Sequence, residues 1–120
     1  MQTVPLQIAN FFTAMQAGRA GAAALSALFA ADAVYVEPFT GAPRRHEGRD
    51  AVMAAMASGW DQPLPEVRIA IDRAETSGNR IEVAWSCYSP ALPGGKGQGR
   101  NSYVLEDGLI KELVTTLESR

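Results

Sequence analysis

The spacing of the apolar residues changes about halfway along this chain. Before residue 60 the apolar side chains recur every three or four residues, which is typical of helices. After Pro65 they alternate with polar residues, which is typical of half-buried strands. This order predicts an α+β fold, in which three N-terminal helices pack on one face of a strongly curved, mostly antiparallel sheet.

Three helices are predicted in the first half, at residues 5–17, 22–30 and 49–58. A cap at Thr3 should begin the first helix, and Gly59 should end the third. The residues at 33–37 favour a short strand that stops at Pro38, because proline cannot donate a backbone hydrogen bond. Residues 40–47 are rich in Gly, Pro and Arg and are expected to form a loop.

The second half predicts a sheet of four strands, at residues 67–72, 81–87, 101–105 and 109–117. Residues 77–79 and 106–108 are expected to form tight turns between them. The segment 89–99 contains four glycines and two prolines with few apolar anchors. It is expected to be a mobile loop.

The composition of the chain excludes some classes of function. The chain has 120 residues and a formal net charge of −2, which fits a single domain over residues 1–120 without a basic field for nucleic acid or anionic lipid. The lone Cys87 cannot form an intramolecular disulfide, which fits a reducing cytoplasm. The apolar segment 20–31 is shorter than the roughly 20 residues that span a bilayer. We therefore expect a cytoplasmic protein that binds neither nucleic acid nor membranes.

Glu37 is the sharpest candidate for chemistry, because it ends a strand whose other residues are apolar. A carboxylate in an apolar cavity loses hydration, which disfavours its charged form and suits a general base. The alternative is an exposed glutamate at the end of the strand, or one that pairs with Arg44 or Arg45. A variant with glutamine at this position distinguishes these interpretations.

Two segments resemble a known family. Leu28-Phe29-Ala30-Ala31-Asp32 with Val36-Glu37-Pro38, and Asp107-Gly108-Leu109-Ile110-Lys111 near the end, are similar to the nuclear transport factor 2-like superfamily. The SnoaL-like and ketosteroid-isomerase-like branch is the nearest. The resemblance implies a cystatin-like conical barrel around an apolar cavity, usually in a homodimer. Fold does not define activity in this superfamily, which includes isomerases, cyclases, dehydratases, epoxide hydrolases and non-catalytic binders.

The resemblance also implies roles for particular residues. Glu37 falls where isomerase-like members keep a proton-shuttling aspartate, and Asn101 falls near the acid that donates a hydrogen bond to the substrate oxyanion. The oxyanion tyrosine aligns with Phe11 or Phe12, which lack a hydroxyl, so steroid isomerisation is not expected. Tyr103, which shares strand parity with Asn101, or Tyr35 could supply the missing hydroxyl. The candidate catalytic residues are therefore Glu37, Asn101 and Tyr103.

The remaining candidates are large side chains that could line the cavity, although such residues at these spacings are usually core. They are Phe11, Phe12, Met15, Tyr35, Phe39, Met53, Met56, Trp60 and Trp85. His46 can exchange a proton near neutral pH, but its arginine-rich surroundings favour a solvated loop histidine. One histidine and one cysteine do not make a zinc site, and Cys87 is expected to be a buried, inert thiol.

Two functions follow from these observations. The first is a cofactor-free isomerase, cyclase or dehydratase that acts on a small hydrophobic carbonyl compound, with Glu37 moving the proton. The second is a non-catalytic module that binds a hydrophobic ligand or a partner chain. In either case a homodimer is expected, because alternating Ile, Val and Trp leave apolar surface on the side of the sheet away from the helices.

Overall fold

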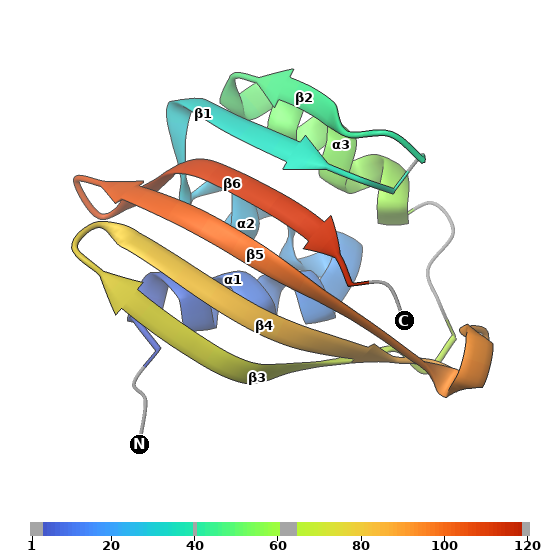
Figure 1. Ribbon diagram of the computed structural model, residues 1–120. Coiled ribbons are helices and arrows are strands. Elements are labelled where there is room, and N and C mark those ends of the chain that lie inside the picture. The colour runs from blue at the N-terminus through green and yellow to red at the C-terminus, as the bar shows by residue number, and fades with distance from the viewer. Residues whose placement is uncertain (1–3, 40, 61–64, 119–120) are drawn as a thin grey trace.

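The protein is one curved sheet with helices on a single face (Figure 1). We describe a computed structural model, which covers residues 4–39, 41–60 and 65–118. Its elements, in chain order, are α1 (Leu6–Ala17), the short 3₁₀ helix η1 (Gly18–Gly21), α2 (Ala22–Ser26), β1 (Phe29–Glu37), β2 (Arg44–Glu47), α3 (Arg49–Trp60), β3 (Arg68–Ser77), β4 (Arg80–Tyr88), the short 3₁₀ helix η2 (Pro93–Gly95), β5 (Lys96–Glu106) and β6 (Leu109–Leu117).

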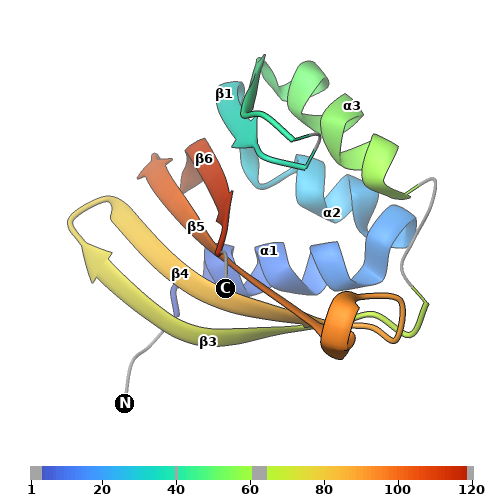
Figure 2. The same cartoon turned by 45° about the vertical axis from the view of Figure 1, so that its right-hand side comes forward.

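The sheet has six strands in the order β2-β1-β6-β5-β4-β3. The strands from β3 to β6 form an antiparallel meander, β1 runs parallel to β6, and β2 runs antiparallel to β1. Because β1 and β6 are parallel, their C-terminal ends lie at the same end of the sheet, where β4 also ends and β5 begins (Figure 1). Figure 2 shows the sheet curling around the helices, which lie on its concave side. The predicted α+β class and curved sheet are confirmed.

The core lies between the helices and the concave face. In α1 the buried residues Ile8, Phe11 and Phe12 follow helical spacing, as the apolar pattern predicts. The Phe11 ring makes edge-to-face contacts with Phe12, Phe29 and Tyr103 at centroid distances of 5.4, 6.3 and 5.3 Å. The other large members of the core are Leu25, Val52, Met56, Ile81, Val83, Ile110 and Leu113.

The predicted second helix is too long, because the structure ends α2 at Ser26 and begins β1 at Phe29. Phe29 is fully buried and pairs with Ile110 of β6. A strand partner 81 positions away along the chain therefore outweighs the local helical preference of residues 27–30. The short strand predicted at 33–37 is the second half of this longer strand.

Other boundaries also differ from expectation. The predicted loop at 40–47 contains the strand β2, and both β1 and β2 join the four strands of the second half, so the sheet has six strands. Within the predicted mobile segment 89–99, residues 96–99 are the first part of β5. The third helix continues to Trp60, two residues beyond the predicted end. The expected cap at Thr3 and the loop residue Thr40 lie outside the described residues.

The turns between strands are at the predicted positions. β3 and β4 are joined through residues 78–79, and β5 and β6 through residues 107–108. Gly48 makes the abrupt change from β2 to α3 with a φ of 91°, which L side chains rarely adopt. Its N–H donates to the Ala33 carbonyl at 2.8 Å. This bond ties the start of α3 to β1, four residues before Glu37.

Candidate functional site

Glu37 is the last residue of β1 and is only 7% exposed. Its Oε1 accepts a hydrogen bond from the Phe39 N–H at 2.8 Å, and its Oε2 lies 3.1 Å from His46 Nε2. The carboxylate is therefore buried and held at both oxygens. Glu37 is therefore not an exposed glutamate at the end of the strand, and its partners are the Phe39 N–H and His46, not Arg44 or Arg45.

The expectation for His46 was wrong. His46 lies on β2 opposite Tyr35, and its side chain is only 16% exposed. Its ring packs on the Tyr35 ring at a centroid distance of 5.9 Å and a tilt of 31°. Strand pairing places the imidazole on the inner face, although the local sequence of Gly, Pro and Arg favours a loop. The result is a buried carboxylate and imidazole in contact across two strands.

A second polar group surrounds Asn101, which lies on β5 and is 5% exposed. Its Oδ1 accepts hydrogen bonds from Trp85 Nε1 at 3.0 Å and from Thr115 Oγ1 at 2.8 Å. Its Nδ2 donates to Tyr103 Oη at 2.8 Å. Three adjacent strands, β4, β5 and β6, thus contribute to one buried hydrogen-bond network.

Tyr35 and Tyr103 contact these two polar groups. Burial raises the pKa of Tyr103 well above its usual value of 10.0. Burial also raises the pKa of Tyr35, and the nearby charge of Glu37 adds to the rise, whereas a hydrogen bond with Thr115 opposes it. Both phenols therefore stay protonated at neutral pH. Tyr35 lies between the Glu37–His46 pair and the Asn101 network, so the two polar groups form one band across the sheet.

Gly99 makes room for the Trp85 indole. The two residues face each other in the β4–β5 register, and a Cβ on Gly99 would lie 2.3 Å from Trp85 Cζ2 and 2.7 Å from the Thr116 carbonyl oxygen. Only glycine lets the indole cross β5 at this point and present its N–H to Asn101. From the sequence, Gly99 is expected at the end of a loop, and nothing in that pattern indicates its contact with Trp85.

The predicted site residues fall into different environments. Phe11, Phe12, Tyr35 and Met56 are buried, and Met15, Met53, Trp60 and Trp85 are partly buried against the same core. Phe39 differs, because it is 58% exposed just beyond β1. Cys87 is half-buried, and burial raises the pKa of its thiol. Whether these side chains line a ligand cavity stays a prediction.

Thr115 was not predicted, although it is buried and contacts Asn101 directly. The sequence does contain a weak signal, because Thr115 alternates with Leu113 on β6 and so shares its inward face. The pairing of Glu37 with His46 has no comparable signal in the sequence. Position 46 joins position 37 only through the register of β1 and β2.

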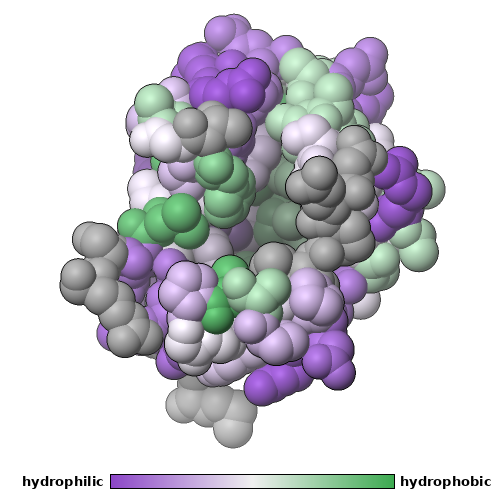
Figure 3. Space-filling model, turned by 90° about the vertical axis from the view of Figure 1, so that its right-hand side faces the viewer, coloured by the Kyte–Doolittle hydropathy of each residue, from purple (hydrophilic) through white to green (hydrophobic). Residues whose placement is uncertain are grey.

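The end of the molecule that carries these groups is hollowed. Figure 3 looks at this end and shows a recess with both hydrophobic and polar side chains around it. Two other depressions lie elsewhere. One, of about 390 Å³, is at the start of α3, and a smaller one, of about 80 Å³, is on the face of the sheet away from the helices. Neither depression is lined by Glu37, Asn101 or Tyr103. The location of the candidate site is therefore defined by its buried polar side chains and not by either depression.

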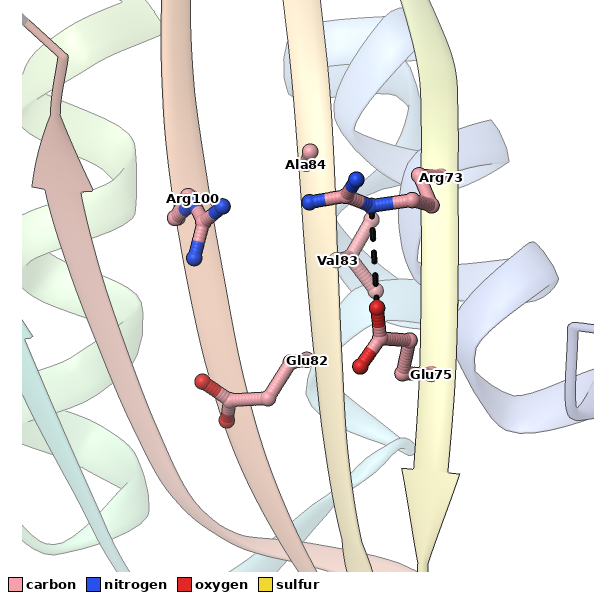
Figure 4. Close-up of a pocket in the computed structure, with 6 residues that line it drawn as sticks. All are labelled: Arg73, Glu75, Glu82, Val83, Ala84 and Arg100. Atoms are coloured by element: carbon pink, nitrogen blue, oxygen red, sulfur yellow. Dashed lines mark ion pairs between the residues drawn. The ribbon is translucent and has the colours of Figure 1, made fainter.

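The smaller depression is lined by charged residues of β3, β4 and β5. Figure 4 shows Arg73, Glu75, Glu82 and Arg100 in front of the sheet, with the helices behind it. Arg73 pairs with Glu75 at 3.7 Å, and both side chains are more than half exposed. Exposed pairs of this kind contribute little to stability. Arg73 and Glu75 are therefore a solvated surface pair.

Among the described residues, no group of three or more His, Cys, Asp or Glu side chains is arranged to hold a metal ion. The helices within the same residues are all too short or too polar to cross a membrane. The polar groups at the candidate site are a carboxylate, an imidazole, an amide, an indole, an aliphatic hydroxyl and two phenols.

Helices packed on a curved, mixed sheet are the architecture of the cystatin-like class of folds. Residues 8–113 match the SnoaL-like domain family, so the chain belongs to this family within the nuclear transport factor 2-like superfamily. The match spans nearly all of the helices and strands described above.

Solved structures agree with this fold. A proposed polyketide cyclase from Sinorhizobium meliloti is similar with a TM-score of 0.78 and 22% identity, over 94% of this chain and 95% of that one. A proposed ketosteroid isomerase from Kribbella flavida is similar with a TM-score of 0.75 and 17% identity, over 95% of this chain and 76% of that one. A protein with a cystatin-like fold from Methylobium petroleophilum is similar with a TM-score of 0.73 and 13% identity, over 95% of this chain and 74% of that one. No curated protein matches the sequence.

Proposed function

We propose that this protein is a cofactor-independent proton-transfer enzyme, an isomerase, cyclase or dehydratase, that acts on a small hydrophobic carbonyl compound. Glu37 takes a proton from the carbon next to the carbonyl, and a donor in the Asn101 network stabilises the oxygen on which negative charge develops. Family membership supports a protein that holds a small molecule, since the fold is shared with proposed polyketide cyclases and ketosteroid isomerases.

One observation carries the proposal: the carboxylate of Glu37 is buried and contacts an imidazole. Its Oε1 is held by the Phe39 N–H and its Oε2 faces His46 Nε2, so the carboxylate has a fixed orientation. The His46 imidazole lies within hydrogen-bond distance of this carboxylate, which gives the base a partner after it has taken a proton. A surface carboxylate would have neither property.

The test measures proton abstraction directly. Small hydrophobic ketones and lactones are incubated with the protein in heavy water, and NMR follows the loss of the signal from protons next to the carbonyl. Glu37→Gln keeps the size and an acceptor for the Phe39 N–H but removes the base, so exchange should fall by about 100-fold or more. Glu47→Gln is the matched control, because Glu47 lies on the adjacent strand with a side chain that is 71% exposed. Unchanged exchange in Glu37→Gln overturns the proposal.

A specific observation favours a second function, a non-catalytic module that binds a hydrophobic ligand. Asn101 already makes three hydrogen bonds within the protein, because its Oδ1 accepts from Trp85 and Thr115 and its Nδ2 donates to Tyr103. A passive pocket needs no free polar group, only shape. If hydrophobic ketones bind but no proton exchange occurs in the wild-type protein, this second function is the correct one.

We also propose that the protein forms a homodimer through the face of the sheet away from the helices. Val34 and Val36 of β1 alternate with inward residues, and Val36 pairs with Val114 of β6, so these side chains share the outer face. Val34, Val36 and Val114 are half-buried in the single chain, and a row of half-buried valines on adjacent strands suits a self-complementary contact. Sedimentation at micromolar concentration should show a dimer that Val114→Glu dissociates, and a monomeric wild type contradicts the proposal.

A cytoplasmic location completes the proposal. The single Cys87 is its support, because proteins of oxidising compartments commonly carry paired cysteines. Cell fractionation tests it, and recovery of the protein outside the cytoplasm would refute it.

A further inference from the structure

The hydrogen bonds around Asn101 have a fixed direction. An asparagine amide offers an oxygen that accepts and a nitrogen that donates, and only its partners decide which faces where. Trp85 Nε1–H can only donate, so the atom that faces it at 3.0 Å must be Oδ1. The nitrogen Nδ2 then faces Tyr103 Oη at 2.8 Å. The indole therefore determines the orientation of the amide.

This orientation determines what Tyr103 can do. Its hydroxyl oxygen accepts a hydrogen bond from Asn101 Nδ2, so its own proton is not used in that contact. Among the residues that the structure describes, the hydrogen bond found for this hydroxyl is the one that it accepts from Asn101. The raised pKa of Tyr103, caused by burial, keeps the phenol in its protonated form. The Tyr103 hydroxyl is thus a donor with a free proton at the inner end of the network.

We propose that Trp85 is a positioning residue that orients Asn101, and that the Tyr103 hydroxyl is the group that donates a hydrogen bond to the ligand. The ligand is then a compound with an acceptor oxygen, a carbonyl or an oxyanion, that enters through the hollowed end of the molecule (Figure 3). This inference rests on the proposed function, and it assigns the donor role to Tyr103 and not to the Asn101 amide.

Thr115 also donates to Asn101 Oδ1, at 2.8 Å, but it does not fix the orientation. A hydroxyl donates or accepts by rotation, so Thr115 tolerates either orientation of the amide. Without the indole N–H the amide can turn, so that Nδ2 faces Thr115 and Oδ1 faces Tyr103. Tyr103 then donates its proton to Oδ1, and that proton is no longer available to a ligand.

Two variants therefore distinguish a change in the orientation of the Asn101 amide from the simple loss of one hydrogen bond to it. Trp85→Phe and Thr115→Val each remove one hydrogen bond to Asn101 Oδ1, but only Trp85→Phe removes the donor that fixes the amide. Para-nitrophenolate serves as the probe, because its visible absorption shifts when its oxygen accepts a hydrogen bond. Tyr103→Phe should weaken phenolate binding by about tenfold or more, since it removes the donor to a charged acceptor.

Trp85→Phe should weaken phenolate binding about as much as Tyr103→Phe and abolish the absorption shift. Thr115→Val should retain the shift and bind within about threefold of the wild type. Equal losses in Trp85→Phe and Thr115→Val overturn the positioning role of Trp85. Full binding and an unchanged shift in Tyr103→Phe overturn the donor role of Tyr103, as does a wild type that binds no phenolate.

An NMR measurement on the unmodified protein does not depend on the variants folding or on a ligand. The side-chain amide protons of Asn101 should show contacts with the Tyr103 ring and not with the Trp85 indole proton. Amide protons that contact the indole proton overturn the inference. Failure of the proposed function is seen separately, in the proton exchange of Glu37→Gln, so the two outcomes are distinguishable.

Discussion

Glu37 Oε2 lies 3.1 Å from His46 Nε2 across the antiparallel pair β1 and β2, and both side chains are largely buried. The two residues are nine positions apart in the sequence, and the strand register brings them together. A buried carboxylate without a partner is costly, so this contact affects stability as well as the proposed chemistry.

The first prediction concerns that contact. His46→Phe keeps an aromatic ring next to Tyr35 but removes the nitrogen that faces Glu37, and should lower the free energy of unfolding by about 1–3 kcal/mol. In a Glu37→Leu background no carboxylate is left without a partner, so the same substitution should cost clearly less. Urea unfolding of the wild type, both single variants and the double variant measures the difference. Equal costs in both backgrounds would show that the contact contributes nothing to stability.

The second prediction concerns the space above Gly99. Gly99→Ala places a Cβ 2.3 Å from Trp85 Cζ2, so the indole must move, and the free energy of unfolding should fall by about 1–3 kcal/mol. The tryptophan fluorescence should change as the Trp85 N–H leaves Asn101. Gly59→Ala is the control, because it lies in α3 with nothing within 4 Å of the added Cβ and should gain about 0.5–1 kcal/mol. Similar effects of the two substitutions would contradict the steric argument.

The third prediction concerns alkaline pH. The pKa values of Tyr35 and Tyr103 are raised above 10.0 in the folded protein, chiefly by burial, so the folded state keeps two protons that the unfolded chain releases. Their stabilising contribution is fully present below about pH 10 and is lost as the pH rises toward the folded-state values. Each phenol should account for up to about 1.4 kcal/mol per pH unit in that range.

Urea unfolding as a function of pH checks this, with the wild type compared with Tyr35→Phe and Tyr103→Phe. Each variant should lose stability less steeply than the wild type above about pH 10. Contributions from Cys87 and Lys111, whose pKa values are also raised, are present in all three proteins and cancel in the comparison. Parallel curves would mean that the phenols are accessible to water.

The fourth prediction concerns the attachment of α1 to the edge strand β3. The Gln16 amide donates to the Val67 carbonyl at 2.7 Å and accepts from the Ile69 N–H at 2.7 Å. Gln16→Ala removes both bonds and should cost about 1–2 kcal/mol of unfolding free energy, because two backbone groups lose their partners. Thr13→Ala, one turn earlier, removes only a bond to the Ala9 carbonyl within α1 and should change stability by less than about 0.5 kcal/mol. Amide hydrogen exchange at Ile69 should increase in Gln16→Ala alone.

Much of the fold could be predicted from local patterns. The inward faces of α1 and β4 follow from the spacing of Ile8 with Phe11 and of Ile81 with Val83, because side-chain periodicity depends only on neighbouring residues. The turns at 78–79 and 107–108 follow from residues that favour them. Glu37 was predicted as a candidate because it ends an apolar strand next to a proline.

The sequence by itself determined the class of fold, the family and the position of one inward carboxylate, since each depends on patterns within a few residues. Only the tertiary structure decided that residues 44–47 form a strand, that His46 contacts Glu37, and that Trp85 orients Asn101 toward Tyr103. The physical reason is that strand pairing and buried hydrogen bonds join groups that are distant in sequence. Their geometry is set by register and by the space that Gly99 leaves open, and neither is a property of any short segment.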